Sequence, residues 1–201
     1  IISTTISLPI SYYSVFTIEE KYGFNKTTKI TFLKDKIKGL LMSLIIGGFI
    51  LFVSIQIYIL FGANFWLWLW LFLSVFLILT NMFYTTLIVP IFNKLSPLEE
   101  GSLKNKIEEY SKKIGYSLDK IFVIDGSKRS SKANAFFSGL GPKKTIALFD
   151  TLIDKHEEDE LVAVLAHEVG HYKKNHIKQG LLLSVLQVGI ICYVLQLCLN
   201  E

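Results

Sequence analysis

The sequence is poor in charge and in cysteine. Charged residues make up 19% of its 201 residues, whereas hydrophobic residues make up 51%. Soluble globular domains carry roughly a quarter charged residues. Two cysteines exclude a disulfide scaffold and a cysteine-rich zinc module. Long apolar runs exclude a disordered chain, a coiled coil and a simple secreted domain. This composition is typical of a membrane protein.

Stretches without Lys, Arg, Asp or Glu predict membrane-spanning helices at residues 40–62, 64–92 and 180–200. At a rise of about 1.5 Å per residue, residues 40–62 extend roughly 34 Å, which is enough to cross the hydrocarbon core of a bilayer. Residues 1–18 are expected to be part of a fourth span, because they lack the pattern of a signal peptide and do not begin with Met. Buried helices of a soluble protein are the disfavoured alternative, since their uncharged runs are shorter.

The basic residues all lie in two segments. Six of the 21 Lys and Arg residues fall in residues 19–39 and the other fifteen in residues 93–179. Two spans joined by a short link place both segments on the same side of the membrane, and the positive-inside rule makes it the cytoplasmic side. We therefore predict a cytoplasmic loop at 19–39 and a cytoplasmic segment at 93–179. The net charge of +4 reflects this orientation and contact with the lipid bilayer, and no nucleic-acid partner is expected.

The segment 93–179 has the pattern of a small α+β unit. Capping residues predict a helix that begins at Ser96 and stops at Gly115. Further elements are predicted from β-rich and amphipathic patterns, namely strands at 121–124, 134–138 and 145–149 and a helix at 157–178. A turn at 139–142 joins the last two strands into a hairpin. The predicted fold class is mainly α, a polytopic membrane helical bundle with this unit attached.

The helix predicted at 157–178 carries the sequence His167-Glu168-Val169-Gly170-His171. Two imidazoles four residues apart lie on one helical face, where both can bind one Zn²⁺ at about 2.0–2.1 Å. Glu168 points elsewhere and is placed to take a proton from a water that the metal activates. Such a site hydrolyses amides without an acyl-enzyme. An accidental match is disfavoured because the chain has only four His residues, and a metal-free histidine pair is disfavoured because the helix is apolar up to the motif.

A zinc site of this kind needs a third protein ligand. In a continuous helix His176 falls on the opposite face from His167, and Glu201 lies beyond the last predicted span. We therefore expect the third ligand to be a Glu downstream of residue 201. It follows that this chain is a fragment of a longer protein, and we expect the fragment alone to bind zinc weakly and to cleave nothing.

The motif and its surroundings resemble the type I CAAX prenyl endopeptidases, which are polytopic membrane zinc metalloproteases with a zincin-like site. The resemblance is carried by HEVGHYKKNH at His167–His176 and by four other stretches, at residues 19–25, 90–98, 129–137 and 148–152. It implies a bundle of seven helices around a water-filled chamber. It also implies one Zn²⁺ per chain, held by His167, His171 and a later Glu, with Glu168 as the catalytic base.

In this family the substrate lies along an edge strand, which corresponds here to Asn134, Ala135 and Phe136. The physical basis is β-augmentation, in which an extended peptide pairs its backbone with an exposed strand. Asn134 is then placed to hold a substrate carbonyl, and the alternative is a turn residue that satisfies its own loop.

The resemblance implies a peptide or protein substrate, with or without a lipid. Two classes remain open, namely prenylated CAAX-type C-terminal peptides and membrane proteins under quality control. Eukaryotic members tend to have His where this chain has Lys132. This difference favours a bacterial member in the cell inner membrane, and the endoplasmic reticulum membrane is the expected location of a eukaryotic one.

A different class of function is a polytopic membrane transporter or scaffold with an incidental or degenerate HExxH. No ionisable residue lies within the predicted spans 40–62 and 64–92, where a transport path would need one. The sequence therefore favours a zinc metalloendopeptidase.

Overall fold

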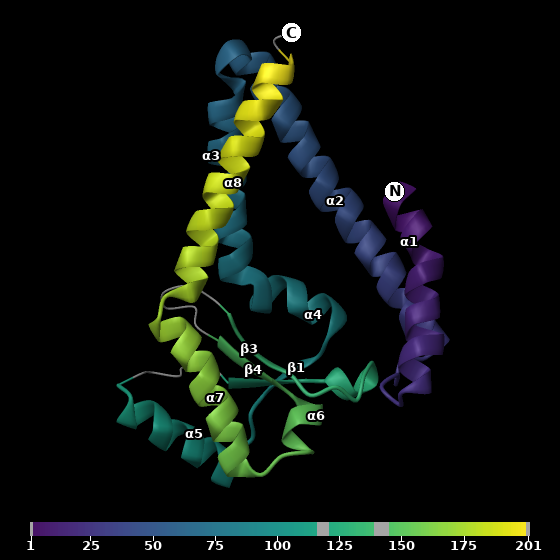
Figure 1. The fold of residues 1–201 in the computed structure, drawn as a ribbon, viewed down its shortest axis with the longest axis vertical. Helices are drawn as coiled ribbons and strands as arrows, with labels where there is room; N and C mark the ends of the chain where they lie inside the picture. The colour runs from purple at the N-terminus through teal and green to yellow at the C-terminus, as the bar shows by residue number, and fades with distance from the viewer. Residues whose placement is uncertain (1, 116–120, 139–144, 200–201) are drawn as a thin grey trace.

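The computed structural model describes residues 2–115, 121–138 and 145–199, so the turn predicted at 139–142 lies outside the described residues. Long helices stand on a small α+β unit (Figure 1). The helical part consists of α1 (Ile2–Tyr13), the π-helix η1 (Ser14–Glu19), α2 (Lys29–Phe61), the 3₁₀ turn η2 (Gly62–Asn64), α3 (Phe65–Phe83), the π-helix η3 (Tyr84–Ile88), α4 (Val89–Phe92) and α8 (His176–Leu199). The predicted fold class, a membrane helical bundle with a small α+β segment, is confirmed.

Two helical stretches of the described chain are long and apolar enough to cross a membrane. One is Lys29–Phe92, which contains α2 and α3, and the other is His176–Leu199. A tight turn at Gly62, whose φ is +46°, reverses the chain between α2 and α3. As a result both basic segments lie at the same end of the molecule, beside the sheet (Figure 1).

The second half of the segment predicted as a cytoplasmic loop, residues 19–39, is helical, because α2 begins at Lys29, and its side of the membrane stays a prediction. The hydroxyl oxygen of Thr28 accepts a hydrogen bond of 3.1 Å from the backbone N–H of Thr31, which caps the first turn. Lysine is a good helix former, so the basic residues extend the helix below the apolar run. The rings of Tyr12 and Phe16 pack edge-on against Phe32, which fixes η1 and α1 beside this turn.

Helices α3 and α8 pack against each other along the apolar part of the molecule. Phe65 and Leu69 of α3 are buried together with Cys192 of α8. The indole N–H of Trp70 donates a hydrogen bond of 2.9 Å to the backbone oxygen of Val185. A carbonyl bonded within its own helix can accept this second bond, which satisfies the indole without water.

The sheet has four strands in the order β1-β2-β4-β3, and its elements are β1 (Leu95–Pro97), β2 (Ile121–Ile124), β3 (Ala135–Ser138) and β4 (Thr145–Phe149). β2 and β4 are parallel, whereas β3 and β4 form the antiparallel pair that the sequence predicted. β3 therefore lies at one edge of the sheet. Helices α5 (Ser102–Lys113) and α7 (Glu158–Lys173) contact each other, and the short helix α6 (Asp150–Ile153) joins β4 to α7.

The helix predicted to begin at Ser96 is wrong. Residues Leu95–Pro97 form β1, which pairs with β2, and the helix begins only at Ser102. The capping pattern around Ser96 depends only on neighbouring residues. The backbone groups that a helix would satisfy are satisfied instead by pairing with a strand some 25 residues away. The predicted stop is confirmed, since α5 ends at Lys113 and Gly115 adopts a φ of +64°.

The continuous helix predicted at 157–178 is also wrong. α7 ends at Lys173, and α8 begins at His176, four residues before the predicted span 180–200. Asn175 has a φ of +57° and separates the two helices. Asparagine tolerates this left-handed conformation better than other residues with a side chain, and it commonly ends a helix there.

Gly189 provides a test of the α3–α8 contact. A Cβ at Gly189 would lie 3.0 Å from the indole nitrogen of Trp70, whereas a Cβ at Gly180 meets nothing within 4 Å. We expect Gly189→Leu in the full-length protein to separate the two helices and to destabilise it by about 1–3 kcal/mol. The measurement is the thermal unfolding midpoint in detergent. Gly180→Leu is the matched control, and equal midpoints for the two variants would contradict the packing described above.

Candidate metal centre

The candidate metal centre is positioned by the buried face of α7. Leu161, Leu165 and Val169 recur every four residues and pack with the sheet core, including Ile146 and Leu148. A helix buried on this stripe turns the intervening residues away from the sheet core. The packing of α7 therefore also sets the direction of the His and Glu side chains of the HExxH motif, because the motif lies on the last turns of this helix.

The start of α7 is held by α5. The hydroxyl of Ser102 donates a hydrogen bond to Glu158, and Lys106 lies 3.0 Å from the other carboxylate oxygen. These contacts, the Ser102 hydrogen bond first, lower the pKa of Glu158. Acidic residues also suit the first turn of a helix, where the dipole is positive. α7 is therefore fixed at its first turn by polar contacts and along its length by apolar packing.

The two predicted ligands face each other. His167 Nε2 lies 3.0 Å from His171 Nε2, and the ring centroids are 4.7 Å apart. Two nitrogen ligands of one tetrahedral zinc lie about 3.3 Å apart, given bonds of about 2.0–2.1 Å. The pair therefore fits a single divalent metal ion without rearrangement of α7. Glu168, on the same turn, is half-buried, whereas both imidazoles are exposed.

Among the described residues, no group of three or more His, Cys, Asp or Glu side chains is arranged to hold a metal ion. His176, considered above as a third ligand, is not on the opposite face. The helix break at Asn175 brings His176 Nδ1 to 2.8 Å from His171 Nδ1. The Nδ1 atom of His171 is not the nitrogen that faces His167, so His176 contacts the side of the His171 ring opposite the predicted metal-binding nitrogen. The third ligand expected downstream of residue 201 stays a prediction.

The direction of the contact between His171 and His176 follows from the chemistry of the pair. A metal-binding nitrogen carries no proton, so a His171 that binds through Nε2 carries its proton on Nδ1. That N–H is then the donor, and His176 Nδ1 is the acceptor. Metal-binding histidines commonly donate their second N–H in this way, which fixes the ring.

The predicted substrate strand lies beside α7. β3 contacts α7 and is the edge strand next to β4. The side-chain oxygen of Asn134 accepts a hydrogen bond of 2.9 Å from the N–H of Ala135, and its backbone oxygen accepts one of 3.0 Å from Phe149. This is the geometry of a residue that satisfies its own loop. A role of Asn134 in substrate binding stays a prediction.

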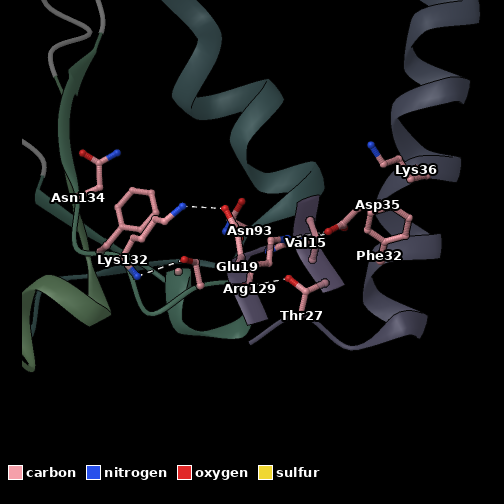
Figure 2. Close-up of a pocket in the computed structure, with 13 residues that line it drawn as sticks. Val15, Glu19, Thr27, Phe32, Asp35, Lys36, Asn93, Arg129, Lys132 and Asn134 are labelled. Atoms are coloured by element: carbon pink, nitrogen blue, oxygen red, sulfur yellow. Dashed lines mark hydrogen bonds and ion pairs between the residues drawn. The ribbon is translucent and has the colours of Figure 1, made fainter. Parts of the chain in front are cut away.

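Two features of this region were not found from the sequence. The ring of Tyr84 in η3 packs edge-on against Phe136, at 6.3 Å between centroids. A cavity of about 500 Å³ lies beside Asn134, between the N-terminal helices and the loop after β2 (Figure 2). No local pattern signals either feature, because both bring together residues more than about 50 positions apart.

Two ion pairs cross this cavity. Arg129 donates hydrogen bonds of 2.7 and 2.9 Å to the two carboxylate oxygens of Asp35 in α2, and this contact raises the pKa of Arg129. The ammonium group of Lys132 lies 2.7 Å from the carboxylate of Glu19 in η1. The two pairs join the helical part to the α+β unit (Figure 2).

Family comparisons match both parts of this architecture. Residues 1–94 match the CAAX prenyl protease N-terminal family, described as five membrane helices, and residues 97–201 match peptidase family M48. The chain belongs to peptidase family M48. The resemblance to the type I CAAX prenyl endopeptidases is thereby confirmed. The predicted ligands and base, which lie on α7, fall within the residues that match M48, and their roles stay predictions.

Relatives of the M48 chain are similar over nearly its whole length. CAAX prenyl protease 1 of Saccharomyces cerevisiae is 48% identical over 94% of the chain and 42% of its own length, and the Homo sapiens homologue is 33% identical over 96% and 48%. The crystal structure of S. mikatae Ste24p superposes with a TM-score of 0.91 at 46% identity, over 97% of this chain and 46% of that one. The chain thus spans about half the length of these relatives.

The contact between His171 and His176 predicts an effect on metal binding. We expect His176→Ala in the full-length protein to weaken zinc binding about 10- to 100-fold, because the His171 ring loses the acceptor that orients it. His176→Asn should restore much of the affinity, since its side-chain oxygen accepts near the position of Nδ1. Competition with a zinc-sensitive chelating dye measures both.

His156 provides the control for this prediction. It is the other exposed histidine near α7, it contacts Glu160 at 3.1 Å, and it lies before the helix. His156→Ala should leave zinc affinity unchanged. Equal affinities for His176→Ala and the unmodified protein would show that His176 does not orient the ligand.

Proposed function

We propose that the full-length protein is an integral-membrane zinc metalloendopeptidase of the CAAX prenyl protease type. The observation that carries this proposal is the approach of His167 Nε2 and His171 Nε2 to 3.0 Å, with Glu168 on the same turn of α7. Membership of peptidase family M48 and the printed names of the relatives support it. We propose one Zn²⁺ per chain, with the third ligand a Glu beyond residue 201.

The residues of this chain then have separate roles. A bound zinc ion would polarise the scissile carbonyl and lower the pKa of water to about 7. Glu168 accepts the proton of the attacking water and delivers it to the leaving amine. The edge of β3, from Ala135 onward, orients the peptide through backbone hydrogen bonds. The aromatic rings of Tyr84 and Phe136 form a wall beside that strand.

We propose prenylated CAAX-type C-terminal peptides as the substrate class. The relatives named above are CAAX prenyl proteases, and this supports that class over membrane proteins under quality control. A transporter or scaffold with a degenerate HExxH is not favoured, because the two histidines retain the spacing of a metal pair.

The proposed location is an integral membrane one with the catalytic segment on the cytoplasmic side. The shared position of the two basic segments at one end of the molecule supports this orientation. The relatives named above are eukaryotic, which supports the endoplasmic reticulum membrane. The bacterial inner membrane inferred from Lys132 stays an untested prediction.

The role of Glu168 is tested by Glu168→Gln in the full-length protein. We expect cleavage of a prenylated peptide to fall at least about 100-fold, because the amide cannot accept the proton, whereas zinc content is unchanged. Peptide cleavage and elemental analysis measure the two quantities on the same preparation. An unprenylated peptide assayed alongside distinguishes the substrate classes. A variant that cleaves at the unmodified rate would exclude Glu168 as the base.

The role of His171 is tested by His171→Ala. We expect this variant to contain much less zinc after dialysis, because one of the three ligands is lost. Glu168→Gln serves as the matched comparison, since it changes the same turn of α7 and keeps both imidazoles. Equal zinc content in the two variants would refute the ligand assignment.

A further inference from the structure

The cavity beside Asn134 lies next to the proposed substrate strand. Its volume is about 500 Å³, and its wall comes from η1, from the first turns of α2 and from residues 126–134. Asn134 lines this cavity and directly precedes β3. Figure 2 shows the side chains of α2 on one side of the cavity and Lys132 on the other. A peptide that leaves β3 at this end therefore reaches the cavity first.

The charges of the cavity leave positive groups available to a ligand. Its two carboxylates, on Glu19 and Asp35, are both engaged by cations, namely Lys132 and Arg129. Lys36 is half-buried, and its ammonium group lies over the ring of Phe32 at 5.1 Å, with no carboxylate partner among the described residues. An ammonium group without a carboxylate partner is available to an anion from outside.

The guanidinium of Arg129 supplies a second donor. Its Nε and Nη2 atoms bond to Asp35, and Nη2 also bonds to the backbone oxygen of Phe92. Its Nη1 atom is buried and has no hydrogen-bond partner within the described part of the chain. A buried donor without a partner is costly, and a bound anion would satisfy it.

The direction of β3 decides which end of a peptide meets these groups. Antiparallel pairs are the more common and slightly more stable arrangement between strands. A peptide antiparallel to β3 runs from Ser138 toward Ala135, so its carboxyl end emerges at Asn134. The group that arrives at the cavity is then the end of the chain, which carries a free carboxylate.

We propose that this cavity binds the free α-carboxylate of the peptide substrate, with Lys36 and Arg129 Nη1 as the groups that recognise it. The inference rests on the proposed function and identifies the part of the substrate that the cavity would bind, namely its free carboxylate. Bonds from ammonium and guanidinium groups to a carboxylate are among the stronger ones in proteins. The cavity would thus favour peptides whose free carboxyl end reaches it.

The test compares two peptides of one sequence, one with a free carboxylate and one with a C-terminal amide, on the full-length protein. We expect the unmodified protein to prefer the free acid about tenfold in kcat/KM, mainly through KM. Lys36→Met, which keeps the length of the side chain and removes its charge, should abolish most of this preference. Arg129 is not substituted, because it also holds Asp35.

Lys34 provides the matched control. It lies on α2 two residues from Lys36, is exposed and does not line the cavity. Lys34→Met should keep the preference for the free acid. Equal kcat/KM for the two peptides in the unmodified protein, or a preference that survives Lys36→Met, would overturn the carboxylate site.

A binding measurement separates this inference from the proposed function. Fluorescence anisotropy with the same two peptides, labelled at the amino end, is carried out on Glu168→Gln, which is expected to bind without cleaving. Tighter binding of the free acid that is lost with Lys36→Met supports the carboxylate site, whether or not the unmodified protein cleaves either peptide. If the unmodified protein cleaves neither peptide, the proposed protease function is refuted and the carboxylate site is not. Equal binding of the two peptides would refute the site.

Discussion

The packing of α7 on the sheet is the constraint on which the candidate centre depends. Leu161, Leu165 and Val169 occupy one stripe of the helix and are nearly inaccessible to solvent. A helix buried on one stripe has a fixed rotation about its axis, and this rotation directs His167 and His171 away from the core. Because α7 also contacts the edge strand β3, the packing of α7 on the sheet places the proposed metal ligands beside the proposed substrate strand.

The break at Asn175 is a second constraint of the same kind. A continuous helix would carry His176 away from His171, whereas the left-handed residue returns it to 2.8 Å. The same break allows α8 to leave in a new direction and to pack against α3. A single backbone conformation therefore links the surroundings of the candidate metal centre to the membrane helices, since α8 begins at the residue that contacts a proposed ligand.

Polar contacts join the N-terminal helices to the α+β unit, whereas Val89 of α4 makes an apolar contact with Ile124 and Ala147 of the sheet. The bidentate contact of Arg129 with Asp35 spans 94 positions of the chain, and the contact of Lys132 with Glu19 spans 113. Bidentate pairs of this kind fix both distance and orientation. They also form the walls of the cavity beside Asn134, so the groups that hold the two parts together are the groups that a ligand in that cavity would meet.

Local patterns in the sequence determined the helical nature of the chain, the strands at 121–124 and 145–149, the helix stop at Gly115 and the HExxH pair, because each depends on the period or spacing of neighbouring residues. The predictions at Ser96 and at 157–178 failed where a distant strand or one left-handed residue outweighed a local preference. Only the tertiary structure decided the contact of His176 with His171, the ring of Tyr84 beside Phe136 and the cavity at Asn134. These features join residues that no repeat period connects, and they exist only once α7, the sheet and the N-terminal helices are packed together.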